Sequence, residues 1–143
     1  MIPKEELSKK KNKKEEIRCF LALDIPEEIN KKVALLENKM WQSGIKPVAP
    51  QNVHVTLKFL GNVSRQKLEC IQQLLKTISF ASFSYEIKGI VFFPNERNPQ
   101  VIWLGVASKE LEALAKHINT VLKKNFSEEK FTAHLTIAEF KSQ

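Results

Sequence analysis

Two stretches of the sequence decide the fold, VHVTLKFL at residues 53–60 and FTAHLTIAEF at residues 131–140. In the first stretch polar residues alternate with apolar ones, as in a β-strand that buries its apolar face; the apolar residues are Val53, Val55, Leu57 and Phe59. Both stretches contain the triplet His-x-Thr, and residues two apart in a strand project to the same side. Each histidine therefore shares a strand face with its threonine. The four residues are His54, Thr56, His134 and Thr136.

The segments around these two stretches repeat in the same order. An apolar strand and an amphipathic helix precede each His-x-Thr strand, and a shift of 82 residues places Phe20 on Ile102. The second His-x-Thr then begins two residues earlier than an exact repeat would place it. The predicted strands are 18–24, 53–60, 83–93, 101–106 and 131–140. Three helices are predicted. The first starts at Pro26 and stops at Gly44. The second covers residues 65–79 after an N-terminal cap at Ser64, and the third follows a cap at Ser108. This order predicts a duplicated α+β fold.

The length of 143 residues fits one compact domain. Residues 1–16 hold six Lys and four Glu with few apolar residues, which predicts a flexible charged tail ahead of a single domain at residues 17–143. The chain has 23 Lys and Arg against 16 Asp and Glu, a net charge of +7, and most of that excess lies outside the tail. A positive domain favours an anionic ligand.

The sequence lacks the patterns that are typical of several classes of protein. A membrane-spanning helix needs about 20 consecutive apolar residues, and a secretory signal needs an apolar segment near the N-terminus. Neither pattern is found, which predicts a cytoplasmic protein that makes no contact with membranes. The four glycines, Gly44, Gly61, Gly89 and Gly105, are too scattered to form a phosphate-binding loop, which disfavours ATP use.

Two histidines on equivalent strands suit acid–base catalysis at a phosphate. In-line hydrolysis of a phosphodiester needs one group that accepts a proton from water and another that protonates the leaving oxygen. Threonine hydroxyls can donate hydrogen bonds to the phosphate oxygens. A single His-x-Thr is typical of any polar strand face, whereas two equivalent copies favour a shared site. Ligand spacings typical of metal sites are missing from these strands, so we predict catalysis without a metal or another cofactor.

Four segments carry a family resemblance in order: RCFLALDIPEEI, NVHVTLKFLG, FFPNERNPQVIWLGV and FTAHLTIAEF. They resemble the LigT-like RNA 2',3'-cyclic phosphodiesterases, formerly called 2'-5' RNA ligases, of the two-histidine (2H) phosphoesterase superfamily. The resemblance implies a bilobal α+β fold whose antiparallel sheets face each other across a central cleft, with helices outside. It also implies hydrolysis of a 2',3'-cyclic phosphate to a 2'-phosphate. By the same resemblance His54 is the general acid, His134 is the general base, and Thr56 and Thr136 bind phosphate.

Additional substrate contacts are less specific in the sequence. Lys58 is expected on the face of His54 and Thr56, where it would bind phosphate or simply be exposed. Arg97 lies in a loop, where it would contact a nucleic-acid backbone or only solvent. Three strand aromatics would stack a base or belong to the core. These are Phe92, Phe93 and Trp103.

The chain departs from the family pattern in two places. Glu139 stands where relatives usually have an arginine, and a carboxylate there would weaken anion binding. The chain also ends soon after the second motif, so the domain is expected to lack the family's last strands. A strand left at an exposed sheet edge can pair with another chain. We therefore expect a monomer, or a dimer formed through this incomplete edge.

Three functions follow from these observations. The first is metal-independent hydrolysis of a 2',3'-cyclic phosphate in RNA ends or small nucleotides. The second is a non-catalytic module that binds RNA ends, favoured by Glu139 and the early end of the chain. The third is a 2'-5' RNA ligase or a phosphodiesterase for another cyclic phosphate, since the same two imidazoles would serve either reaction.

Overall fold

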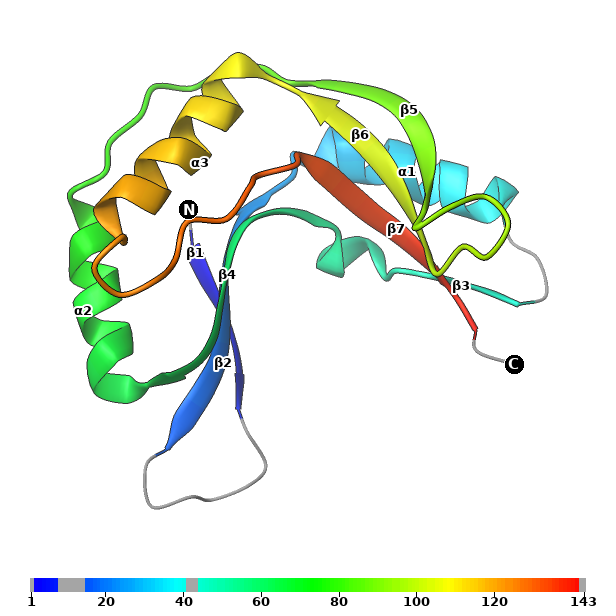
Figure 1. The fold of residues 1–143 in the computed structure, drawn as a ribbon. Helices are drawn as coiled ribbons and strands as arrows, with labels where there is room; N and C mark the ends of the chain where they lie inside the picture. The colour runs from blue at the N-terminus through cyan, green and yellow to red at the C-terminus, as the bar shows by residue number, and fades with distance from the viewer. Residues whose placement is uncertain (1, 8–14, 41–43, 142–143) are drawn as a thin grey trace. The chain divides into compact units, whose positions relative to one another are not determined.

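The computed structural model describes residues 2–7, 15–40 and 44–141 and shows an α+β fold (Figure 1). The helical elements are α1 (Glu27–Lys39), η1 (Pro50–Asn52), α2 (Arg65–Lys76) and α3 (Lys109–Val121). The strands are β1 (Ile2–Leu7), β2 (Glu16–Asp24), β3 (Ile45–Pro47), β4 (His54–Ser64), β5 (Glu86–Phe93), β6 (Val101–Ala107) and β7 (His134–Phe140). Within the described residues the chain forms two compact units. Unit 1 is drawn from residues 1–23, 56–85 and 108–132, and unit 2 from residues 24–55, 86–107 and 133–143.

In unit 1, β2 lies between β1 and β4, and α2 contacts α3. Both helices begin at a serine cap, as predicted. The hydroxyl oxygen of Ser64 accepts the Lys67 N–H, and that of Ser108 accepts the Leu111 N–H, each at 3.2 Å. Each cap pairs a donor that the first helical turn leaves unsatisfied. The core of unit 1 includes Ile17, Leu21, Leu68, Ile71, Leu111, Ile118 and Leu122.

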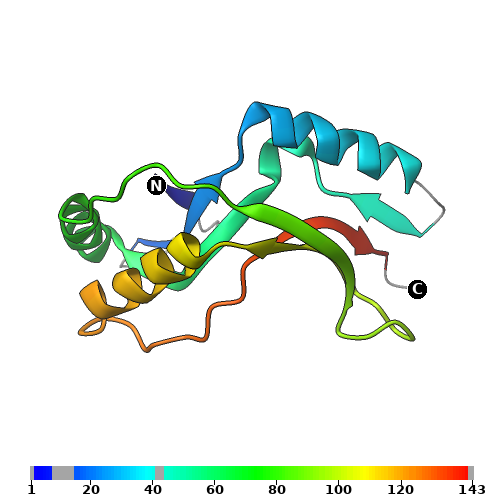
Figure 2. The ribbon, with the colours of Figure 1, turned by 90° about the horizontal axis from the view of Figure 1, so that it is seen from above.

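In unit 2, β7 is the central strand. β6 pairs antiparallel along one edge of β7, while β3 and the first residues of β4 share the other edge. β5 pairs with β6 as the outer strand, and α1 packs against β7 and η1 (Figure 2). The buried apolar residues of unit 2 include Val33, Val55, Ile102, Leu104, Leu135, Ile137 and Ala138.

The predicted α+β class and the repeated order of elements are confirmed. One half of the repeat is β2, α1 and β4, and the other half is β6, α3 and β7. In both halves the His-x-Thr strand pairs with the strand that precedes the helix, because β2 neighbours β4 and β6 neighbours β7. The duplication is therefore visible in the strand pairing as well as in the sequence.

The predicted flexible tail is wrong for residues 2–7. These residues form β1, which pairs antiparallel with β2 from Ile2 opposite Ala22 to Leu7 opposite Ile17. Residues 8–14 of the predicted tail lie outside the described residues. An edge strand offers unpaired backbone N–H and C=O groups to any extended segment, whatever its side chains. Low hydrophobicity therefore did not prevent this segment from adding to the sheet.

Several element boundaries also differ from the prediction, and α2 ends at Lys76, three residues before its predicted end. α1 ends at Lys39, and Gly44, with φ of 93°, instead precedes the unpredicted strand β3. β4 continues through Gly61 to Ser64, although Gly61 was expected to end it. Gly61 has φ of 72°, which glycine adopts without a steric penalty, so the strand changes course there without stopping. β5 begins at Glu86, three residues after its predicted start.

Glu37 is a buried carboxyl group on α1. The residue is only 6% exposed, and its Oε1 has no hydrogen-bond partner within the described residues. Val33, one turn earlier on the same face, is buried too. Burial raises the pKa of Glu37 from 4.5 to about 7. The ionised carboxylate is therefore unfavourable in the folded state.

We expect the free energy of unfolding to fall as the pH rises from about 4.5 to about 7. In that interval the unfolded chain releases the Glu37 proton while the folded chain retains it, so deprotonation favours unfolding. Glu37→Gln should remove this part of the pH dependence. Urea unfolding at the two ends of the interval measures it, with the exposed Glu28→Gln as the matched control. An equal slope for Glu37→Gln and wild type would contradict the prediction.

Candidate active site

The pairing of Val55 with Leu135 brings the two His-x-Thr strands together. These residues lie directly opposite each other in the antiparallel β4/β7 pair, and both are buried. His54 and His134 each precede one of them, so both imidazoles project from the opposite, half-buried face. Positions related diagonally in this way lie about 7 Å apart. The two histidines therefore belong to one face of unit 2.

A backbone carbonyl orients the imidazole of His54. Nδ1 of His54 lies 2.6 Å from the carbonyl oxygen of Asn52, the last residue of η1. A carbonyl oxygen only accepts, so Nδ1 must carry the hydrogen. In the neutral ring the lone pair is then on Nε2. This hydrogen bond selects the tautomer in which Nε2 exchanges protons.

An aromatic stack lies against His134. Its imidazole stacks on the indole of Trp103, with centroids 4.1 Å apart and planes inclined by 24°. Trp103 lies on β6 directly opposite Thr136, so the second histidine, its threonine and this indole share one face. Phe93 in turn stacks on Trp103, with centroids 4.5 Å apart and planes inclined by 11°.

Thr56 follows Val55 on β4 and belongs to unit 1. It is half-buried, like His54 two residues earlier. Unit 2 by itself thus contains His54, His134 and Thr136, which are three of the four predicted residues.

Lys58 is not exposed, although one of the two expectations for it required exposure. The residue is 4% exposed, and its ammonium donates to Asn119 Oδ1 at 2.5 Å and to the Ser127 carbonyl at 2.8 Å. Leu57, its neighbour on β4, is buried as well, whereas Phe59 is 59% exposed. Lys58 is therefore an internal brace of unit 1, because both hydrogen bonds hold its ammonium inside that unit.

Arg97 lies in the loop between β5 and β6. The side-chain oxygen of Asn95 accepts the N–H groups of Arg97 and Asn98 and shapes this loop. The loop joins β6 at Val101, four residues from Gly105, which pairs with His134. Four strand residues span about 13 Å, so the structure does not bring Arg97 next to the histidines.

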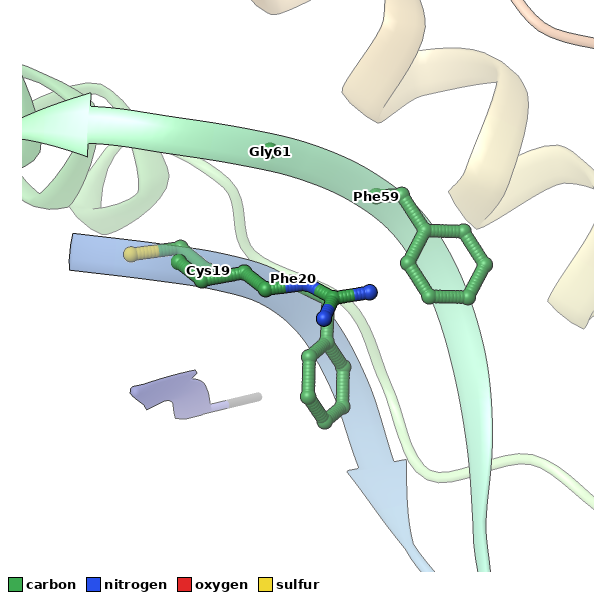
Figure 3. A pocket seen from close by; sticks show the side chains of 5 residues that line it. Cys19, Phe20, Phe59 and Gly61 are labelled. Carbon is green, nitrogen blue, oxygen red and sulfur yellow. The ribbon is translucent and has the colours of Figure 1, made fainter. Parts of the chain in front are cut away.

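A pocket lies on unit 1 between β2 and β4 (Figure 3). Phe20 and Phe59 approach with ring centroids 6.1 Å apart, and Arg18, Cys19 and Gly61 complete the lining. Strand alternation predicted that Phe59 is buried, whereas its side chain is 59% exposed and lines this pocket.

The described residues contain no cluster of three or more His, Cys, Asp or Glu side chains that could hold a metal ion. In the same residues no helix is both long and apolar enough to cross a membrane.

Two residues that contribute to this site were not predicted from the sequence. Asn52 acts through its backbone carbonyl, which leaves no signal in the sequence. Trp103 was noted only as a strand aromatic. Its place in the repeat, next to the second His-x-Thr strand, was the available signal that it could approach His134.

Residues 22–103 match the family model described as LigT like Phosphoesterase, a range that contains His54. The chain is 40% identical over 129 residues to an RNA 2',3'-cyclic phosphodiesterase of Archaeoglobus fulgidus, covering 87% of this chain and 73% of the relative. It is 37% identical over 127 residues to the protein of that name in Methanocaldococcus jannaschii, covering 87% and 72%.

Solved structures agree with these matches. The crystal structure of a Thermus thermophilus protein superposes with a TM-score of 0.80 at 27% identity, over 88% of this chain and 75% of that chain. The apo form of Escherichia coli LigT superposes with a TM-score of 0.76 at 29% identity, over 88% and 73%. That LigT has also been solved in complex with 3'-AMP.

We expect Lys58→Met to lower the free energy of unfolding by about 2 kcal/mol, because it leaves two acceptors in unit 1 without their donor. Lys76→Met, at an exposed position of α2, is the control and should change little. Urea denaturation of both variants measures the difference. If Lys58→Met is as stable as the control and instead weakens substrate binding, the assignment of Lys58 as an internal brace fails.

Proposed function

This chain belongs to the family of LigT-like phosphoesterases, and on that premise we propose that it hydrolyses 2',3'-cyclic phosphates at RNA ends or in small nucleotides. The product would carry a 2'-phosphate and a 3'-hydroxyl. The observation that carries the proposal is the placement of His54 and His134 on one face of two neighbouring strands. The names of the two relatives supply the substrate class.

In the proposed reaction His134 takes a proton from water as the oxygen attacks phosphorus. The bond from phosphorus to the 3' oxygen breaks, and His54 gives its Nε2 proton to that oxygen. The Asn52 carbonyl supports this role, because it holds the Nδ1 hydrogen and leaves Nε2 for proton transfer. After the reaction His134 is protonated and His54 is neutral. His134 must lose a proton and His54 must regain one before the next turnover.

The threonines are proposed to bind the phosphate. A hydroxyl donates one hydrogen bond to a nonbridging oxygen and so stabilises the charge that develops as water attacks. Thr136 lies two residues from His134 on the same strand face, and Thr56 has the same spacing from His54. We propose that this chemistry needs no metal ion, since the two imidazoles supply both proton transfers.

The proposed substrate partner is RNA or a nucleotide. The net charge of +7 suits a polyanion, and Escherichia coli LigT in complex with 3'-AMP shows that a related protein binds a nucleotide. Arg97 is proposed as a contact to the RNA backbone away from the reacting phosphate. Lys58 is not part of the proposal, because its ammonium is bound inside unit 1.

We expect the protein to convert an oligoribonucleotide with a 2',3'-cyclic phosphate end into the 2'-phosphate product in the presence of EDTA. His54→Ala and His134→Ala should each lower kcat/KM by a factor on the order of 10² to 10⁴, the usual effect of a positioned acid or base. His117→Ala is the matched control, because His117 is exposed on α3 in unit 1. Chromatography against 2'- and 3'-phosphate standards identifies the product.

The other outcomes of this experiment each reject the proposal in a different way. Salt-sensitive binding of the RNA without any product would identify a non-catalytic module for RNA ends. Joining of RNA ends would identify a ligase. Hydrolysis that EDTA abolishes would show that a metal ion takes part.

We further expect a bell-shaped dependence of kcat/KM on pH. The rate rises with pH as the general base loses its proton and falls again as the general acid loses its own. The two limbs report the pair of histidines and need not be assigned to single residues. Steady-state rates across the neutral range measure the profile, and a profile with a single limb would contradict a two-histidine mechanism.

A further inference from the structure

We propose that Trp103 is a positioning residue that holds the imidazole of His134 in the orientation needed for proton transfer. The inference rests on the proposed function and adds to it a residue outside the two His-x-Thr motifs. It is carried by the stack of Trp103 on His134 described above, with centroids 4.1 Å apart.

The strand register explains why Trp103 meets His134. Gly105 is the residue directly opposite His134 in the β6/β7 pair, and it presents no side chain. A Cβ atom at that position would collide with the backbone carbonyl of Lys88. The position opposite His134 therefore carries no side chain, and the diagonal neighbour two residues away, Trp103, is within reach of the imidazole.

Trp103 is itself held in place. Phe93 stacks on the indole almost in parallel, with the planes inclined by 11°. Phe93 comes from β5, so the three rings form a column across β5, β6 and β7. An imidazole packed on such a column cannot rotate freely about its Cβ–Cγ bond, a torsion that is otherwise broad.

The burial of the residues along β6 indicates that Trp103 belongs to the candidate site and that its two neighbours belong to the core. The neighbours of Trp103, Ile102 and Leu104, are 0% and 5% exposed and form the buried face of β6. Trp103 lies on the other, half-buried face, together with His134 and Thr136. The stack engages the face of the imidazole, whereas proton transfer takes place at its edge.

The test compares Trp103→Leu with Trp103→Phe in the full chain. A misplaced catalytic group costs up to about a hundredfold in rate. We expect Trp103→Leu to lower kcat about ten- to a hundredfold with KM within about twofold of wild type. Trp103→Phe keeps a ring against the imidazole and should restore most of kcat. Phe80→Leu, which removes an exposed aromatic of unit 1, is the control and should leave kcat unchanged.

A second measurement does not depend on activity. In the wild-type protein, the ring-current field of the indole should shift the carbon-bound imidazole protons of His134 upfield relative to those of His117. Trp103→Leu should move the His134 signals downfield and leave the His117 signals in place. Because the wild-type spectrum already tests the stack, the proposal can be judged even if Trp103→Leu does not fold.

The proposal is overturned by a wild-type spectrum without the upfield shift. It is also overturned if folded Trp103→Leu retains kcat or changes only KM, or if Trp103→Phe loses as much kcat as Trp103→Leu. If wild type shows the shifted His134 signals but hydrolyses no cyclic phosphate, the proposed function fails while the stack stands. The two failures are thereby distinguished.

Discussion

The pairing of Val55 with Leu135 is the contact on which the proposed chemistry depends. Both side chains are almost fully buried, at 1% and 0% exposure, and this burial fixes which face of each strand points inward. Side chains alternate with a period of two, so a slip of one residue on either strand would turn that strand's histidine toward the core. Hydrophobic burial of two aliphatic residues thus determines that both imidazoles reach one surface.

Much of this arrangement could be predicted from the sequence. Apolar periodicity located α2 and α3, and the serines at their starts cap them as expected. The repeat predicted that the two His-x-Thr strands occupy equivalent places, and the pairing pattern agrees. These features are local, or they recur at a fixed separation, and a single sequence contains that information.

The failures have a common physical origin in contacts between distant residues. Alternation placed Lys58 on the polar face, but its ammonium is paired with Asn119 and Ser127, 61 and 69 residues along the chain. Alternation also placed Phe59 inside. β1 was missed because strand addition uses backbone groups, and β3 is too short, at three residues, for any period to show.

The two histidines are oriented by different interactions. His54 is held at a ring nitrogen through its hydrogen bond to Asn52, whereas His134 is held at its ring face by Trp103. A hydrogen bond at a ring nitrogen selects a tautomer, whereas a stack on the ring face restricts rotation of the ring. This asymmetry distinguishes two residues that the duplicated sequence makes look equivalent.

The carbonyl of Asn52 has an evolutionary consequence. The turn of η1 orients this carbonyl through two backbone hydrogen bonds, from Asn52 N–H to Ala49 and from Val53 N–H to Pro50. The amide side chain of Asn52 has no part in the contact with His54. Selection on this contact therefore acts on the length and shape of the turn, and the amino acid at position 52 can drift without loss of the tautomer. A comparison of residue identities would pass over this position, although its peptide group is part of the proposed catalytic apparatus.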